Sequence, residues 1–359
     1  MRKVNNLVTK CKSLLIEDND IKNLGWKMAA DDYHLGKLDY HKYSPIFSPF
    51  VIANRLFSTK NKLDGYCFRY LNDYPSLSKT LLRALAEAIS ILILKMFRKR
   101  VLWICHNVDA ETESNYQVIT KFRRGLLKRF SDRIFVTDKL LVPHAQSLLR
   151  RKEIYVCSFG DTTKIISETG VDLPDKAKQW IFTLRKTNST MKIGLWIGSA
   201  NKKNLDSLRL LVNLAKDQNK RFAFVVIGPI SKVLSKIEPD IYKEIKDNPY
   251  IYKHFDYFPL EISVWNCYFD FVVKGLSDLS IGFTIYQAVS VKLPILTLSN
   301  SFIERVVEEY NIGVAVDIDN YNPYEVFKVL ERKDWAFENF SKVHSWYGGA
   351  RSLFDGLVD

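Results

Sequence analysis

The sequence lacks the signals of several broad classes of protein. No stretch approaches the roughly 18 to 20 apolar residues of a membrane-spanning helix, and residues 1–20 contain no unbroken apolar core of the kind that a signal peptide has. Internal repeats and low-complexity tracts are also missing. These absences predict a globular protein in the cytoplasm.

Cysteine is scarce, and acidic residues are too few to balance the basic ones. The five cysteines are odd in number, and none lies at metal-ligand spacing from another cysteine or a histidine, so we interpret them as core residues in a reducing compartment. Lys and Arg (53) exceed Asp and Glu (40) by 13, which favours a polyanionic partner: nucleic acid, a nucleotide or an anionic membrane surface. Because no nucleic-acid-binding motif is present, we expect no nucleic-acid partner, and a basic nucleic-acid-binding protein is kept as a rival interpretation.

The sequence does contain a regular alternation of strand and helix patterns. With 47% hydrophobic and 26% charged residues, the 359-residue chain is globular and long enough for two domains. From residue 63 onward, β-rich runs alternate with helical patterns, which is typical of parallel sheets covered by helices. We predict two Rossmann-like doubly wound α/β domains, 1–165 and 186–330, facing each other across a cleft, and an aromatic helical tail, 331–359, that packs back toward the N-terminal domain.

The predicted strands are 65–70, 101–107, 133–137 and 154–158 in the first domain and 192–197, 222–227, 251–255, 269–273, 294–298 and 313–316 in the second. The predicted helices are 76–100, 116–130, 139–151, 205–217, 233–246, 262–266, 283–291 and 302–310. Residues before 63 are interpreted mainly as loop, with a weak strand at 50–53.

Two turns of the second domain have the composition of phosphate-binding turns. Between the strands at 269–273 and 294–298, a turn opens a helix, and the backbone N–H groups at a helix start attract phosphate. The strand at 192–197 leads into GSANKKN, where glycine permits close backbone approach and lysine supplies a point charge. The residues concerned are Ser280, Ile281, Gly282, Phe283 and Thr284 in the first turn and Gly198, Ser199, Lys202 and Lys203 in the second. An ordinary crossover and a solvated basic turn are the alternatives.

In their order, these motifs resemble the donor domain of GT-B glycosyltransferases. The likeness runs from Gly198 and its lysines through VVIGP at 225–229 to SIGFTIYQAVSVKLPIL at 280–296, and it covers roughly residues 191 to 317. It implies a nucleotide-sugar donor, with the N-terminal domain binding the acceptor. HFDYFPLE at 254–261 lies where the resemblance places contacts to the nucleobase, and Phe258, Phe255 or Tyr257 can stack on the base, with core packing as the alternative. Gln287 can bind a sugar or ribose hydroxyl, with a surface glutamine as the alternative.

The sequence departs from the family where retaining members carry two glutamates. Leu279 and Gln287 occupy those positions, and Ser199 replaces the usual arginine, which favours an inverting reaction with a separate base. We expect no metal, because a helix dipole and lysine can stabilise the departing diphosphate. The motifs DND at 18–20 and DID at 317–319 imitate the Asp-x-Asp metal motif of the other major glycosyltransferase fold, and we interpret both as coincidental.

The acceptor side is assigned to VLWICHNVDAETES at 101–114, a buried strand that ends in polar residues. His106 and Asn107 match a strand-terminal His-Asn of the family, and His106 is expected to touch the transferred sugar or the phosphate. The acidic loop supplies the catalytic base: Glu111 is the first choice, Asp109 and Glu113 are close by, and Asp31 or Asp32 are alternatives.

The helical segment 80–100 has an apolar run and a basic end, which can dock on an anionic membrane. Arg123, Arg124, Lys128 and Arg129 can extend that basic patch, while a crossover helix buried against the sheet is the alternative. Together the features predict a peripheral enzyme at the inner face of the cell membrane that transfers a sugar to a lipid-linked or oligosaccharide acceptor in surface polysaccharide or lipopolysaccharide biosynthesis. A sugar-nucleotide epimerase or hydrolase on the same fold is the rival enzyme.

Overall fold

The computed structural model describes residues 11–18, 20–58, 62–109, 115–166, 170–199, 204–229, 234–256, 259–275 and 278–358. These residues form two compact units. Unit 1 takes 11–106, 115–159 and 346–358, and unit 2 takes 107–109 and 160–345, each with the gaps just given. Among the described residues, no helix has both the length and the apolar character needed to cross a membrane.

Unit 1 is built on a six-stranded parallel sheet in the order β2-β1-β3-β4-β5-β6. The strands are β1 (Ser13–Ile16), β2 (Lys37–Tyr40), β3 (Gly65–Phe68), β4 (Arg100–Ile104), β5 (Arg133–Val136) and β6 (Tyr155–Val156). The order reverses between β1 and β3, and such a topological switch point is where doubly wound sheets bind ligands at their carboxyl edge.

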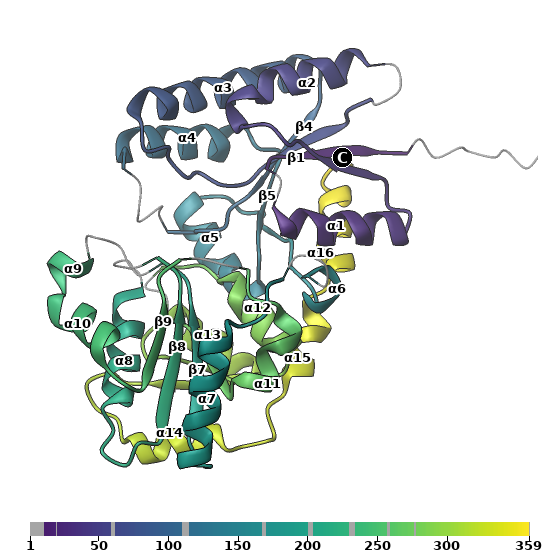
Figure 1. The fold of residues 1–359 in the computed structure, drawn as a ribbon. Helices are drawn as coiled ribbons and strands as arrows, with labels where there is room; N and C mark the ends of the chain where they lie inside the picture. The colour runs from purple at the N-terminus through teal and green to yellow at the C-terminus, as the bar shows by residue number, and fades with distance from the viewer. Residues whose placement is uncertain are drawn as a thin grey trace, which may run out of the picture. The chain divides into compact units, whose positions relative to one another are not determined.

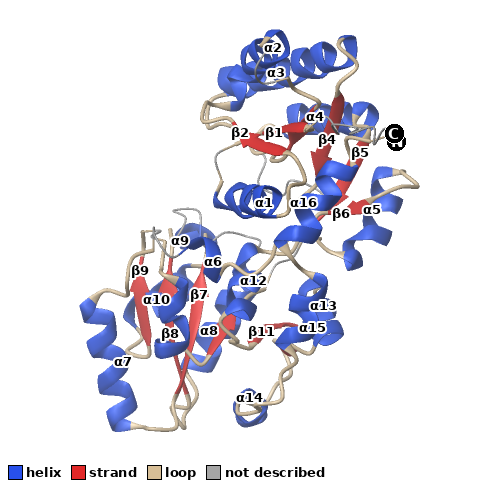
Figure 2. Cartoon of the chain, turned by 90° about the vertical axis from the view of Figure 1, so that its right-hand side faces the viewer, coloured by secondary structure: helices blue, strands red, loops and turns tan. Residues whose placement is uncertain are grey.

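Helices cover both faces of this sheet. On one face α2, α3 and α4 lie together, and α1 and α16 lie on the other (Figure 1, Figure 2). The helices of unit 1 are α1 (Ile21–Asp32), α2 (Ser48–Phe57), α3 (Leu77–Met96), α4 (Gln117–Phe130), α5 (Val142–Leu149) and α16 (Trp346–Asp355). The weak strand predicted at 50–53 is wrong, because this segment belongs to α2, where Pro49 lies in the first turn.

Unit 2 contains a second six-stranded parallel sheet, in the order β12-β11-β10-β7-β8-β9. The strands are β7 (Lys192–Ile197), β8 (Phe222–Ile227), β9 (Ile251–His254), β10 (Phe271–Val273), β11 (Ile295–Leu298) and β12 (Gly313–Val316). Read from β9, this is the 3-2-1-4-5-6 order of the Rossmann fold, and its switch point lies between β7 and β10.

The helices of unit 2 are α6 (Thr163–Ile166), α7 (Asp175–Thr187), α8 (Leu205–Ala215), α9 (Leu234–Ile237), α10 (Pro239–Asp247), α11 (Trp265–Tyr268), α12 (Phe283–Ser290), α13 (Phe302–Tyr310), α14 (Pro323–Leu330) and α15 (Phe337–Val343). The single helix predicted at 233–246 is wrong: Pro239 starts a second helix there, since proline cannot donate to a preceding turn. The residues set apart as a tail divide between the units, with α15 in unit 2 and α16 in unit 1.

The core of unit 2 is packed by aromatic side chains from neighbouring strands. Phe222, Phe224 and Phe271 are buried, and Phe271 meets the other two rings edge to face, with the Phe224 and Phe271 centroids 5.9 Å apart. Gly194 leaves room for them, because a Cβ there would lie 2.7 Å from both Phe224 and Phe271. The packing holds β7, β8 and β10 in register and so places their carboxyl ends.

Candidate functional site

The carboxyl edge of unit 2 brings two glycine turns together at the switch point. Gly198 follows β7 and donates its N–H to the Ile227 carbonyl (3.1 Å), and Gly228 follows β8. The backbone at Gly228 has φ 129°, and a Cβ there would lie 1.9 Å from the Gly198 carbonyl oxygen. Only glycine fits this close approach of the two backbone segments.

Lys274 follows β10 and reaches into the same edge. Its Nζ lies 3.6 Å from the position that a Cβ on Gly198 would take, and its side chain is 8% exposed. Burial lowers the pKa of Lys274 to about 8, and the Asp278 carboxylate opposes that shift. Among the described residues, the Lys274 ammonium has no hydrogen-bond or ion-pair partner within contact distance, although the backbone N–H of Lys274 donates to the Leu296 carbonyl (2.9 Å). A buried cation in that state is costly, and a ligand anion would relieve the cost.

The turn before α12 completes this edge. The Ser280 hydroxyl donates to Asp278 Oδ1 (2.7 Å), and its N–H donates to the Asp278 carbonyl (3.0 Å). Gly282 is the N-cap of α12, and no side chain caps the helix there. Ile281 is buried, whereas Phe283, Thr284 and Gln287 are half-buried. The turn therefore presents backbone to a ligand at the positive end of a helix.

Residues 107–109 group with unit 2. The Val108 N–H donates to the Leu279 carbonyl (3.0 Å), which puts Asn107 and Asp109 beside the turn that opens α12. Asp109 Oδ1 is buried and has no hydrogen-bond partner among the described residues. A buried carboxylate oxygen without a hydrogen-bond donor can accept a hydrogen bond from a ligand hydroxyl.

Five of the predicted site residues lie outside the described residues: Lys202, Lys203, Phe258, Glu111 and Glu113. Their roles stay predictions. Ser199 is described, is exposed, and its carbonyl accepts from the Asn204 side chain (2.8 Å). The two alternatives for the base, Asp31 and Asp32, lie in the last turn of α1, which leads into the amino end of β2 and hence to the edge opposite His106.

The carboxyl edge of unit 1 carries a saturated polar cluster at its own switch point. Arg69 follows β3 and is buried; its guanidinium donates to Asn23 Oδ1 (2.7 Å) and to the Tyr70 hydroxyl (2.8 Å). Tyr70 in turn donates to Asp20 Oδ2 (2.7 Å), and Lys22 Nζ lies 3.1 Å from the same oxygen. These cations hold the pKa of Asp20 well below its usual range even though burial opposes that shift.

His106 lies beside this cluster, and its surroundings favour the neutral form of its imidazole. It stacks on Tyr70, with centroids 4.5 Å apart, and Arg69 Nε donates to its Nε2 (3.4 Å). Burial lowers the pKa of His106 well below the ordinary value, and the positive charges of Arg69 and Lys22 add to that effect. Because arginine has no acceptor, Nε2 must be unprotonated and the proton must sit on Nδ1. His106 is thus a hydrogen-bond donor rather than a base.

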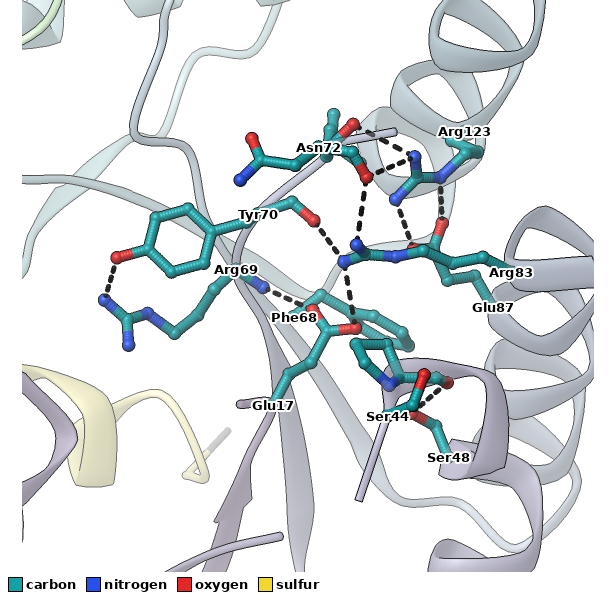
Figure 3. Close-up of polar contacts among 12 residues, drawn as sticks. Glu17, Ser44, Ser48, Phe68, Arg69, Tyr70, Asn72, Arg83, Glu87 and Arg123 are labelled. Carbon is teal, nitrogen blue, oxygen red and sulfur yellow. Dashed lines mark hydrogen bonds and ion pairs between the residues drawn. The ribbon is translucent and has the colours of Figure 1, made fainter. Parts of the chain in front are cut away.

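A buried ionic network supports this edge from behind (Figure 3). Arg83 donates to the carbonyls of Tyr70 (2.6 Å) and Asn72 (2.9 Å), and Arg123 donates to that of Leu71 (3.0 Å). Both arginines bind Glu87, at 3.1 Å from Arg83 Nε and 2.8 Å from Arg123 Nε. Three successive carbonyls of the loop after β3 are thereby fixed, so the loop that carries Arg69 and Tyr70 is held in one conformation.

Glu17 joins the network to the cluster. Its Oε2 accepts from the Arg69 N–H (3.1 Å), and its Oε1 lies 3.5 Å from the Arg83 guanidinium. Burial raises the pKa of Glu17 to about 7, partly offset by Arg83. The neighbouring Asp18 has φ 75°, and its half-buried carboxylate has no hydrogen-bond or ion-pair partner within contact distance among the described residues. Asp18 and Asp20 therefore have different surroundings although they share one DND motif.

The structure adds Lys274, Arg69 and Asp18 to the residues found from sequence. Lys274 interrupts an apolar run directly after a strand, the same signal that pointed to His106. Arg69 and Asp18 carry no such signal, because β1 was not recognised and the predicted strand 65–70 ran past the true end of β3 at Phe68.

Neither a protein-family model nor a curated protein sequence matches the chain. Solved structures do. A glycosyltransferase from Rickettsia africae has a TM-score of 0.65 at 12% identity, covering 98% of this chain and 99% of its own. Sucrose-phosphate synthase from Thermosynechococcus elongatus has a TM-score of 0.63 at 10% identity, covering 96% of this chain and 98% of its own. HepE from Anabaena, solved with UDP and glucose, has a TM-score of 0.55 at 12% identity, covering 97% of this chain and 96% of its own.

A UDP-GlcNAc 2-epimerase from Methanocaldococcus jannaschii is similar at the same level, with a TM-score of 0.54 at 15% identity over 95% of this chain and 98% of its own. At such identities the likeness concerns the fold. The chain has the GT-B fold, and the prediction of two Rossmann-like α/β domains is confirmed.

Proposed function

We propose that this chain is a nucleotide-sugar-dependent glycosyltransferase whose donor binds at the carboxyl edge of unit 2. The observation that carries the proposal is Lys274: a buried cation, without a partner among the described residues, at the switch point of a Rossmann-ordered sheet and beside Gly198. The solved complexes of HepE with UDP and glucose and with UDP-glucose support a uridine diphosphate sugar as the first donor to test.

In this proposal the diphosphate lies between Lys274 and the turn at 280–283. The positive end of α12 and the lysine stabilise the charge that develops on the leaving diphosphate, so the reaction needs no metal. Ser199, Lys202 and Lys203 add contacts to the phosphates, Thr284 and Gln287 contact the sugar, and Phe258 stacks on the base.

Inversion needs one base and one group that orients the reacting hydroxyl or sugar. Asp109 is our choice for the base among the described residues, because its Oδ1 is buried and unpaired beside the donor turn. Asp18 is the alternative, and Glu111 and Glu113 remain predictions. His106 donates a hydrogen bond through Nδ1, because Arg69 occupies the other ring nitrogen.

The acceptor in this proposal is a lipid-linked or oligosaccharide glycan of surface polysaccharide or lipopolysaccharide biosynthesis. The protein would then work peripherally on the inner, cytoplasmic face of the cell membrane, against anionic lipid. The basic excess of 13 charges supports an anionic partner of this kind.

Thermal-shift screening against UDP-, GDP-, ADP- and CMP-sugars tests the donor site, because a ligand specific for the folded state raises the melting temperature. We expect one nucleotide class to raise it in the parent and not in Lys274→Met. Lys243→Met, an exposed lysine on α10, is the matched control and should respond like the parent. A parent chain that no nucleotide-sugar stabilises would refute the proposal.

A sugar-nucleotide epimerase or hydrolase is the second candidate, favoured by the similarity to the UDP-GlcNAc 2-epimerase. The two candidates separate when a bound donor is incubated without acceptor. An epimerised sugar-nucleotide or free sugar released at an unchanged rate would favour this candidate, whereas acceptor-dependent release of the nucleotide would favour the transferase. A salt-sensitive DNA shift without nucleotide-sugar binding would favour a nucleic-acid-binding protein instead.

A further inference from the structure

Helix α3 exposes more apolar surface than a helix on the surface of a globular domain usually does. Its buried side carries the polar residues Thr80 and Ser90 and the Arg83–Glu87 ion pair beside apolar ones, Ala84, Ala86, Ile91 and Leu94. Its outer face is apolar, and most of these side chains are about half exposed or more. They are Leu77, Leu81, Leu82, Leu85, Ile89, Leu92 and Met96, with Leu85 at 57%, Leu92 at 59% and Met96 at 70%.

The neighbouring helices extend this apolar face. In Figures 1 and 2, α2 and α4 lie beside α3 on the same side of the unit 1 sheet. Phe50 and Phe57 are exposed on α2, each at 74%, and Val118 and Phe122 are exposed on α4. Scattered apolar residues are normal on a surface, but large exposed apolar side chains gathered on three neighbouring helices indicate an interaction site.

The charges on these helices are of one sign. In α2, α3 and α4 the one acidic residue is Glu87, which is buried by Arg83 and Arg123. Lys79, Lys121 and Arg129 are exposed on the same helices. Arg123, predicted as part of a basic surface patch, is instead fully buried, so that expectation is corrected, while Arg129 does reach solvent.

We infer that the outer face of α2, α3 and α4 docks on an anionic lipid bilayer, with the leucines and phenylalanines entering the interface and the basic residues meeting lipid phosphates. The combination of apolar and exclusively basic surface fits this occupant. A second copy of the chain fits less well, because a two-fold interface pairs this face with itself, and α2, α3 and α4 carry no exposed acidic residue to meet the basic ones. The inference deepens the proposed function, since it rests on that function for the lipid-linked acceptor.

Co-sedimentation of the full chain with phosphatidylcholine vesicles, with and without phosphatidylglycerol, tests the docking. We expect binding to the anionic vesicles that weakens as salt rises and little binding to pure phosphatidylcholine. The double variant Leu85→Gln/Leu92→Gln should reduce the partition coefficient by about tenfold or more, since two apolar contacts are lost. Phe182→Gln, at a 70%-exposed position on α7 in unit 2, is the matched control and should bind like the parent.

The basic residues need their own variant. Lys121→Gln/Arg129→Gln should reduce binding and flatten its salt dependence, while Lys243→Gln on α10 should change neither. Failure of the parent chain to bind anionic vesicles would overturn the inference, as would unchanged binding by the leucine variant or a stable dimer that this variant dissociates. The same preparations are tested for donor-induced thermal shift, so loss of lipid binding with an intact shift refutes the docking and leaves the proposed function standing.

Discussion

Buried cationic side chains lie at the carboxyl edges of both sheets, but among the described residues only those of unit 1 have hydrogen-bond or ion-pair partners. In unit 1, Arg69, Arg83 and Arg123 are each hydrogen-bonded to carboxylates, carbonyls or a ring hydroxyl. In unit 2, Lys274 is buried without a partner within contact distance among the described residues. A hydrogen-bonded network fixes the backbone, whereas a buried cation without a counter-ion raises the free energy of the folded protein. The first edge is a framework, and the second carries the charge that the proposed nucleotide-sugar donor would neutralise.

Removing a guanidinium from the unit 1 network should have the largest effect. Arg123→Met leaves the Leu71 carbonyl without its donor and removes one of the two arginines that bind Glu87, and we expect the free energy of unfolding to fall by about 3–5 kcal/mol, measured by urea denaturation. Arg129→Met, on the exposed side of α4, should change it by less than about 0.5 kcal/mol. Similar values for the two variants would mean that the network does not stabilise unit 1.

Lys274→Met should act in the opposite direction on stability. Methionine fills the same space without a charge, so we expect the unfolding free energy of the free protein to rise by about 1–3 kcal/mol at pH 7. The same variant should lose stabilisation by a nucleotide-sugar. A free Lys274→Met protein that is less stable than the parent would show that the lysine already has a stabilising partner.

The two edges should also respond to pH with opposite slopes. Because the folded pKa of Glu17 is about 7 against an ordinary 4.5, the folded state holds the extra proton, and stability falls as pH rises from about 4.5 to 7. Because the folded pKa of Lys274 is about 8 against 10.5, the unfolded state holds the extra proton, and stability rises from about pH 8 to 10.5. Urea titrations of Glu17→Gln and Lys274→Met should each lose one slope and keep the other.

The smallest effect is expected at His106. His106→Asn removes one donated hydrogen bond, so kcat/KM for transfer should fall by about tenfold. Asp109→Asn removes the proposed base, so transfer should fall much further while the donor-induced thermal shift persists. If the histidine variant is the more impaired of the two in transfer, the roles given to these two residues are reversed.

Some elements could be predicted to the residue. Strands 192–197, 222–227 and 313–316 and helix 302–310 are confirmed at both ends, because buried parallel strands and an amphipathic helix leave clear patterns. β1 and β2 were missed. β2 lies inside the polar stretch DYHLGKLDYHKYSP at 32–45, which indicated loop, and β1 is a single four-residue run in the segment before it.

The site could be predicted only in part for a related reason. His106 and the turns at 198 and 280–283 stand at strand ends in the sequence itself. The partnership of Arg69 with His106 joins residues that lie 37 positions apart, and Glu17 meets Arg69 across 52. Pairings at that range follow from strand order, which no local pattern contains.

The sequence alone determined that this chain is an α/β protein with two parallel sheets, because the periods of buried strands and covering helices are local properties. It also determined which strand ends carry polar residues. The tertiary structure decided which buried charged side chains have hydrogen-bond or ion-pair partners. Arg83 and Arg123 lie inside a network of such partners, and the Lys274 ammonium does not. That distinction depends on neighbours brought from distant strands, since the energy of a buried charge is set by what surrounds it.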